Sequence, residues 1–179
     1  MPELLEIDNL QISATSYPPG ERPRQITIVD GVSLRLERGK VLGLIGESGA
    51  GKSTIGLSSM AYGRGGIRLS GGSVRLDGQE LLAAKPKELR RIRGARVAYV
   101  AQSAAAAFNP AHRLITQVIE VSVRQGLMSE AEARKRAVEL FRTLSLPDPE
   151  TFGERYPHQV SGGQLQRAMT AMALCPRPD

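Results

Sequence analysis

A glycine-rich stretch that follows a short apolar run constrains this chain more than any other feature. Residues 41–45 read VLGLI, and residues 46–54 read GESGAGKST. The apolar run has no polar alternation, which predicts a parallel strand covered on both faces. A helix is predicted from near Lys52 to about Tyr62. A strand, a tight glycine loop and a helix in this order are typical of a site that holds phosphate groups.

The loop matches the complete phosphate-binding pattern, Gly46-x-x-x-x-Gly51-Lys52-Ser53. Glycines let successive N–H groups turn toward one anion, and the following helix adds its positive N-terminal end. Lys52 would supply charge for the outer phosphates, Ser53 would coordinate Mg²⁺, and Thr54 would reach an inner phosphate. The alternative, a glycine turn with a surface lysine, is disfavoured by the strand and helix on either side. The predicted nucleotide-binding residues are Gly46, Glu47, Ser48, Gly49, Ala50, Gly51, Lys52, Ser53 and Thr54.

A second glycine-rich helix start lies later in the chain, at Val160, Ser161, Gly162, Gly163 and Gln164. Ser161 and Gln164 have the spacing of a capping box, and the two glycines leave the first N–H groups of the helix uncovered. A helix is predicted over 161–175, with Pro176 after it. Spacing alone supports two readings equally: a second anion site or merely a well-capped helix.

Hydrophobic periodicity predicts the other elements. Alternation of apolar and polar residues indicates half-buried antiparallel strands over 3–12 (as one or two pieces), 32–36 and 73–76. The last of these ends in the turn Asp77-Gly78. A Pro/Gly-rich loop covers 16–25. A second buried strand is expected over 97–101. Helices are expected over 86–94 and throughout 111–145, where Ser129 and Glu132 form a capping box.

Composition narrows the class of protein. The chain has 179 residues, a net charge of +6, few aromatics and one cysteine, Cys175. The positive charge indicates either an anionic partner or solvated helix faces. Aromatics that could stack on bases are scarce, so we expect no nucleic-acid partner. No apolar run approaches the length that spans a membrane.

The two glycine-rich segments together resemble the nucleotide-binding subunit of ATP-binding cassette (ABC) transporters. GESGAGKST matches the phosphate-binding loop of that family, and VSGGQ stands where the family has its signature motif. Gln102, after RVAYVA, falls at the position of the Q-loop glutamine. The resemblance spans essentially the whole chain. It implies an α/β fold of the P-loop NTPase type, with a RecA-like parallel sheet, an antiparallel β subdomain and a helical subdomain.

The resemblance also implies how the parts divide and act. Residues 1–101 would hold the antiparallel β subdomain and P-loop core, 102–160 the Q-loop and helical subdomain, and 161–179 the signature helix. Two subunits would sandwich two ATP molecules head to tail, so that residues 160–164 contact the ATP held by the partner. Lys52 and Gln102 would be the catalytic residues, and Ser53 and Gln102 would contact Mg²⁺.

Finer features resemble the importers of dipeptides, oligopeptides and nickel. These are GESGAGKS, the FNP at 108–110, and RYPHQVSGGQLQRAMTAMAL. The resemblance implies an ATPase subunit, peripheral on the cytoplasmic side of the inner membrane, that drives uptake of a peptide or related small solute. Its partners would be a second ABC ATPase subunit, identical or different, transmembrane permease subunits and, indirectly, a solute-binding protein. The sequence does not identify the solute.

Two departures from the family pattern matter. The aromatic residue that stacks on adenine is expected at Ala14, so Tyr17 is the candidate substitute, with an ordinary loop tyrosine as the alternative. The sequence ends at Asp179, before the Walker B acidic pair, the D-loop and the switch histidine; neither His112 nor His158 has the context of that histidine. We therefore expect an incomplete ABC ATPase that hydrolyses ATP poorly and aggregates or needs a partner.

Two other functions remain open from the sequence. One is an ABC-type ATPase that acts outside transport, in DNA repair or translation. The other is a nucleotide-binding fragment that does not hydrolyse ATP.

Overall fold

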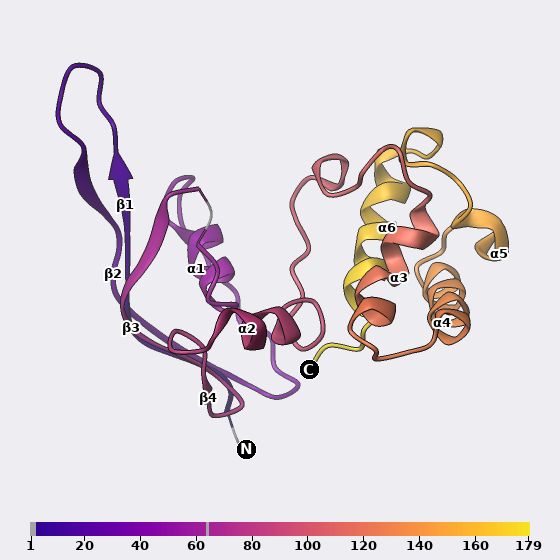
Figure 1. Cartoon of the computed structure of the whole chain (residues 1–179), viewed down its shortest axis with the longest axis horizontal. Coiled ribbons are helices and arrows are strands. Elements are labelled where there is room, and N and C mark those ends of the chain that lie inside the picture. The colour runs from indigo at the N-terminus through magenta and orange to yellow at the C-terminus, as the bar shows by residue number, and fades with distance from the viewer. Residues whose placement is uncertain (1–2, 64) are drawn as a thin grey trace. The chain divides into compact units, whose positions relative to one another are not determined.

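The computed structural model describes residues 3–63 and 65–179, which divide into two compact units, residues 1–89 and residues 90–179 (Figure 1). The first unit holds a β-sheet and two short helices: β1 (Glu3–Ser16), β2 (Arg24–Glu37), α1 (Lys52–Ser58), β3 (Ile67–Leu76), β4 (Gln79–Glu80) and most of α2 (Pro86–Ile92). The second unit is helical: η1 (Ala104–Ala106), α3 (Leu114–Arg124), α4 (Glu130–Thr143), α5 (Pro149–Phe152), η2 (Pro157–Gln159) and α6 (Gly162–Leu174). The finer division at 101 and 160 stays a prediction.

The sheet is antiparallel, with strand order β2-β1-β3-β4. The alternation expected along 32–36 is confirmed, because Val32, Leu34 and Leu36 are half-buried while the residues between them are exposed. β3 and β4 turn at Asp77-Gly78, as predicted, with both residues at positive φ, 50° and 77°.

A bulge crosses three strands of this sheet. Ile7 and Leu10 are three residues apart, so strict alternation would place them on opposite faces, yet both are buried. Between them Asn9 adopts φ 45°, and the pairing of β1 shifts register with both β2 and β3. A Cβ at Gly72 of β3, which has φ +89°, would lie 2.4 Å from the Asn9 carbonyl oxygen. Glycine at this position lets the bulge form and keeps Ile7 and Leu10 in one core.

The buried parallel strands expected over 41–45 and 97–101 do not form. Residues 41–45 and 98–101 are irregular. The side chains of Val41 and Ile45 are 97% and 99% exposed. A strand covered on both faces needs paired neighbours along its edges and helices over its faces. Within 3–63 and 65–179 the paired strands are all antiparallel, and a lone parallel bridge joins Arg93 to Val97. Without partner strands, the apolar runs remain irregular.

Two predicted helices are shorter than expected. The helix from Lys52 ends at Ser58 instead of near residue 62, because Ala61 takes the left-handed conformation, at φ 51°. The expected continuous helix over 111–145 is two helices, α3 and α4. Gly126 at φ 70° turns the chain after α3, and Ser129 with Glu132 caps α4 with the predicted capping box.

The second unit is built around one apolar cluster. Helices α3, α4 and α6 pack against one another, and Phe141 and Phe152 meet edge to face with ring centroids 5.2 Å apart. The cluster consists of Ala104, Phe108, Leu114, Ile115, Val118, Ile119, Ala133, Ala137, Leu140, Phe141, Leu146, Phe152, Leu165, Ala168, Met169, Ala171 and Cys175. Burial raises the pKa of the Cys175 thiol, so the lone cysteine behaves as a core residue. None of the helices in the described residues is long and apolar enough to cross a membrane.

Candidate nucleotide-binding site and signature helix

The loop between residues 46 and 51 has the backbone conformation that its glycines permit. Gly46, Gly49 and Gly51 have φ angles of 155°, 86° and 83°. Gly51 also sits against β2, since a Cβ there would lie 3.3 Å from Cγ2 of Val29. Residues with side chains rarely adopt this region, so the loop curls where the sequence pattern predicted a phosphate cradle.

The side chain of Lys52 bonds to the backbone at the start of this loop. Its ammonium group donates hydrogen bonds to the carbonyl oxygens of Gly46, at 2.7 Å, and Glu47, at 2.5 Å. An ammonium has three donors, so one remains for an added anion. Lys52 is also the first residue of α1, and the Ile55 N–H donates to the Gly51 carbonyl at 2.9 Å. The lysine side chain therefore folds back over its own loop, and its phosphate-binding role stays a prediction.

The other predicted nucleotide-binding residues are distributed around this loop. Ser53 is exposed and Thr54 half-buried in the first turn of α1, and Glu47, Ser48 and Ala50 are exposed. Tyr17 directly follows β1 and is 75% exposed. The loop that joins β1 and β2 stands clear of α1 in Figure 1. The role of Tyr17 in adenine stacking remains a prediction.

The second glycine-rich helix start is well defined. The Ser161 Oγ accepts a hydrogen bond from the Gln164 N–H at 3.3 Å, and the Ser161 N–H donates to Gln164 Oε1 at 2.9 Å. This confirms the capping box. Ser161, Gly162 and Gly163 are exposed, and a Cβ on either glycine would meet nothing within 4 Å. The Ser161 hydroxyl accepts within its own helix and keeps its proton free to donate outward.

Gln102 lies in the same unit as this helix. Its side chain is exposed, in irregular backbone just before η1. The structure thus assigns the predicted residues to two groups: Tyr17 and residues 46–54 belong to the first unit, and Gln102 and residues 160–164 belong to the second.

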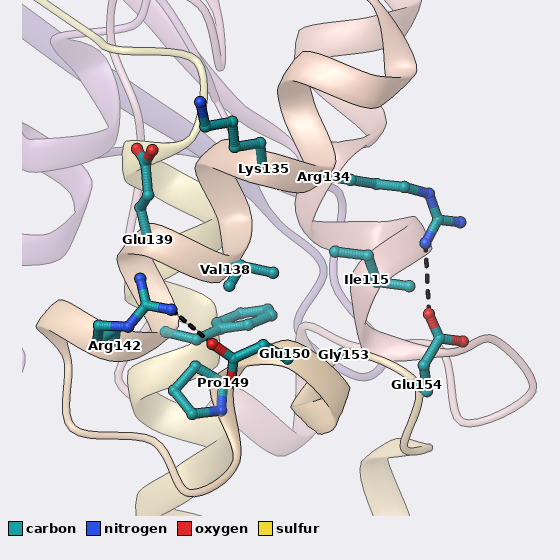
Figure 2. A pocket seen from close by; sticks show the side chains of 11 residues that line it. Ile115, Arg134, Lys135, Val138, Glu139, Arg142, Pro149, Glu150, Gly153 and Glu154 are labelled. Atoms are coloured by element: carbon teal, nitrogen blue, oxygen red, sulfur yellow. Dashed lines mark hydrogen bonds and ion pairs between the residues drawn. The ribbon is translucent and has the colours of Figure 1, made fainter.

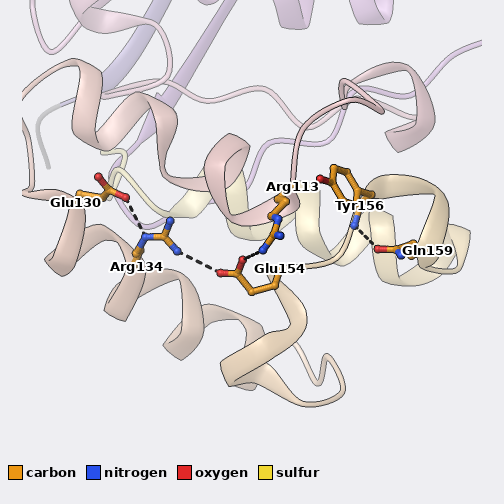
Figure 3. A network of polar contacts seen from close by, with 6 residues as sticks. All are labelled: Arg113, Glu130, Arg134, Glu154, Tyr156 and Gln159. Atoms are coloured by element: carbon orange, nitrogen blue, oxygen red, sulfur yellow. Dashed lines mark hydrogen bonds and ion pairs between the residues drawn. The ribbon is translucent and has the colours of Figure 1, made fainter.

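An ion-pair network holds the segment that leads into the signature motif (Figure 3). Arg134 of α4 contacts Glu154, at 3.3 Å, and Glu154 also pairs with Arg113. Arg113 in turn lies over the ring of Tyr156, with 5.9 Å between the guanidinium carbon and the ring centroid. Hydrogen bonding to Arg113 is the main cause that holds the pKa of Glu154 below its ordinary value, with attraction to Arg134 adding to it. The sequence gives no sign of this network, because its members are charged residues far apart in the chain that match no motif.

A groove of about 480 Å³ lies beside this network (Figure 2). The ion pairs Arg134–Glu154 and Arg142–Glu150 stand at its sides, the second with a 2.6 Å contact. Its lining residues come from α3, α4 and α5 and the residues after α5: Ile115, Arg134, Lys135, Val138, Glu139, Phe141, Arg142, Pro149, Glu150, Gly153 and Glu154. The groove thus combines apolar and charged walls.

A glycine loop that curls around a lysine at the start of a helix is typical of the P-loop class of proteins. The chain belongs to the ABC transporter family, whose family model matches residues 29–179. The predicted fold class, an α/β cassette of the ABC ATPase type, is therefore confirmed. Within it, the described residues form the antiparallel and helical parts.

Relatives and solved structures agree with this assignment. The chain is 35% identical over 176 residues to the dipeptide transport ATP-binding protein DppD of Escherichia coli strain K12, covering 98% of this chain and 52% of the relative. It is 35% identical over 179 residues to the oligopeptide transport ATP-binding protein AppD of Bacillus subtilis strain 168, covering 99% and 53%. It thus spans about half the length of these curated relatives. A dimeric, post-hydrolysis structure of the ATP-binding cassette MJ0796 with ADP and phosphate matches with TM-score 0.78 and 27% identity, covering 97% of this chain and 70% of that one.

Proposed function

We propose that this chain is the ATP-binding part of an importer subunit and that residues 46–54 hold the triphosphate. The observation that carries the proposal is the position of the Lys52 ammonium, between the carbonyl oxygens of Gly46 and Glu47 inside a loop of left-handed glycines. An ammonium held there can exchange loop carbonyls for phosphate oxygens without moving its backbone. Tyr17 is the candidate for stacking on adenine.

The signature helix serves the nucleotide of a second subunit in this proposal. Ser161 has a free hydroxyl proton, and the N–H groups of Gly162 and Gly163 begin a helix of 13 residues. These groups are exposed, so a neighbouring chain can reach them. Two subunits arranged head to tail would thus complete each other's sites, and ATP would stabilise the pair.

Ser53 and Gln102 are the proposed contacts for Mg²⁺, and each offers the kind of oxygen that this ion binds. Ser53 offers a hydroxyl and Gln102 an amide oxygen, and Mg²⁺ prefers oxygen ligands while retaining several waters. When bound, Mg²⁺ would neutralise charge on the transferred phosphoryl group. Lys52 would hold the outer phosphates, and Gln102 would orient the attacking water.

The proposed partner is a membrane permease, and the proposed cargo is a peptide or related small solute. Support comes from DppD and AppD, which are described as dipeptide and oligopeptide transport proteins. The groove of Figure 2 is the candidate contact for the permease, because apolar and ion-paired walls together suit a short amphipathic helix. In this arrangement the subunit is peripheral, on the cytoplasmic side of the membrane.

Two variants test the proposal. Lys52→Ala should weaken Mg-ATP binding by at least tenfold, measured by calorimetry or with a fluorescent ATP analogue, because charge-assisted contacts to phosphate are lost. Ser161→Arg should leave ATP binding by the single subunit unchanged but prevent ATP-driven pairing in analytical ultracentrifugation. Normal pairing of Ser161→Arg would overturn the role of the signature helix, and unchanged ATP binding by Lys52→Ala would overturn the proposed site.

A further inference from the structure

One hydrogen bond joins the segment that carries Gln102 to the signature helix. Gln166, in the second turn of α6, donates from Nε2 to the carbonyl oxygen of Ala101 at 3.2 Å. Ala101 directly precedes Gln102. We propose that Gln166 is a positioning residue, which fixes Gln102 relative to the signature motif and transmits changes between them. This inference rests on the proposed function.

The segment around Gln102 is attached to the core on both sides. Ala101 packs against the apolar cluster of the second unit, and Ala104 is buried within it, 5% exposed. Gln102 and Ser103, between these two attachment points, are exposed. The reach of the Gln102 side chain is therefore set by where Ala101 and Ala104 are held.

Both attachment points meet the signature helix. η1, which begins at Ala104, packs against α6. The side-chain amide of Gln166 holds the backbone at Ala101. The residues that lead up to this point, 98–101, are irregular and form no strand pairing. In the absence of a strand, this side-chain hydrogen bond replaces the pairing that would otherwise fix the backbone before Gln102.

Gln166 is placed to transmit movement. It lies five residues after Ser161, and the helix between them is continuous and capped. A helix moves as a rigid element over this length. If Gln102 shifts when it contacts the nucleotide of its own subunit, Ala101 must move α6, and with it Ser161, or lose the Gln166 hydrogen bond. The Gln166 side-chain amide thus couples the contact of Gln102 with one ATP to the contact of Ser161 with the other.

Hydrogen–deuterium exchange on the whole chain, with and without Mg-ATP, tests this role. Gln166→Met keeps the length of the side chain and removes the donor, and Gln166→Lys restores an N–H donor on a stem of similar length. Thr170→Ala is the control, because Thr170 is half-buried on the same helix and donates to the Gln166 carbonyl, whereas the bond to Ala101 comes from the Gln166 side chain. Unchanged exchange of α3 and α4 shows that each variant is folded.

Without nucleotide, Gln166→Met should loosen this segment and speed exchange of the Ala107 amide, which donates to the Ala104 carbonyl at 2.9 Å, by up to roughly fivefold, the factor expected for one lost hydrogen bond. Thr170→Ala should not, and Gln166→Lys should restore the slower rate. With Mg-ATP, exchange in 164–167 should change in the wild type and in Gln166→Lys but not in Gln166→Met.

Two results would overturn the inference. One is equal exchange of the Ala107 amide in the wild type and Gln166→Met. The other is the same ATP-dependent change in 164–167 in both. Protection of 46–54 by Mg-ATP reports the proposed function separately. Should that protection be absent, the proposed function fails, and the nucleotide-free comparison still decides whether Gln166 positions Gln102.

Discussion

Gly153 sets how closely the end of α5 approaches α3, and replacing it should destabilise the helical unit. Its backbone is helical, at φ −65° and ψ −19°, so alanine would bring no conformational strain. An added Cβ would, however, lie 2.7 Å from Cβ of Ile115 and 3.2 Å from Cε2 of Phe141. Both neighbours are buried, and the Ile115 N–H donates to the Gly153 carbonyl at 2.8 Å.

The size of the loss in unfolding free energy depends on which atom the added Cβ overlaps. The Cβ of Ile115 is fixed to its backbone, so a change of rotamer cannot relieve the overlap, and α3 and α5 must separate. Overpacking of this kind costs about 1–3 kcal/mol, and we expect the upper half of that range because the contact is roughly 1 Å too short. A loss of about 2 kcal/mol would lower the urea midpoint by about 0.7–2 M.

Far-ultraviolet circular dichroism during urea unfolding measures this change, because α3, α4 and α6 hold most of the helical residues in the described chain. Gly163→Ala is the matched control: it is helical, and its Cβ would meet nothing within 4 Å. We expect the control to be neutral or more stable by up to ~1 kcal/mol. A Gly153→Ala midpoint equal to that of the wild type would refute the reasoning, because it would show that α5 can withdraw from α3 at no cost.

Three further predictions concern other parts of the chain. Gly72→Ala should destabilise the sheet by about 2 kcal/mol or more, because residue 72 has φ +89° and the added Cβ would lie 2.4 Å from the Asn9 carbonyl oxygen of β1. Faster amide exchange in residues 3–16 would report this loss of stability, and exchange at the wild-type rate would contradict the prediction. The pKa of Glu154 is held low chiefly by hydrogen bonding to Arg113, so its contribution to stability is present above its ordinary pKa, about 4.3, and is lost as pH falls through the lower, folded value. Glu154→Gln should flatten the fall of the urea midpoint below about pH 5, and an identical slope would contradict the role of this ion pair. Replacing both Val41 and Ile45 with serine should reduce aggregation measured by light scattering, since both are almost fully exposed; equal aggregation would place the cause elsewhere.

Features encoded by a few neighbouring residues were predictable from the sequence. Both capping boxes, Ser129 with Glu132 and Ser161 with Gln164, are found as predicted, because a cap needs only four residues. The Asp77-Gly78 turn is similarly local. The phosphate-binding pattern indicated the loop for the same reason.

Features that depend on distant partners were predicted wrongly or missed. The run VLGLI has the composition of a buried strand, but pairing decides whether a strand forms, and the described residues supply no neighbour for it. The pairing of Arg113 with Glu154 joins residues 41 positions apart, and the bond from Gln166 to Ala101 joins residues 65 apart. Nothing in the local pattern of either residue indicates the partner.

The bulge at Asn9 has a consequence for how the hairpin of β1 and β2 tolerates change. Because it is matched by left-handed glycines in both neighbours, at Gly31 and Gly72, sliding any strand by one residue would place a side chain where only glycine fits. The alignment of the strands is therefore locked from within the sheet and does not depend on the loop over 17–23. That proline-rich loop is free to lengthen or shorten during evolution, and it is where we expect insertions to be accepted without disturbing the core.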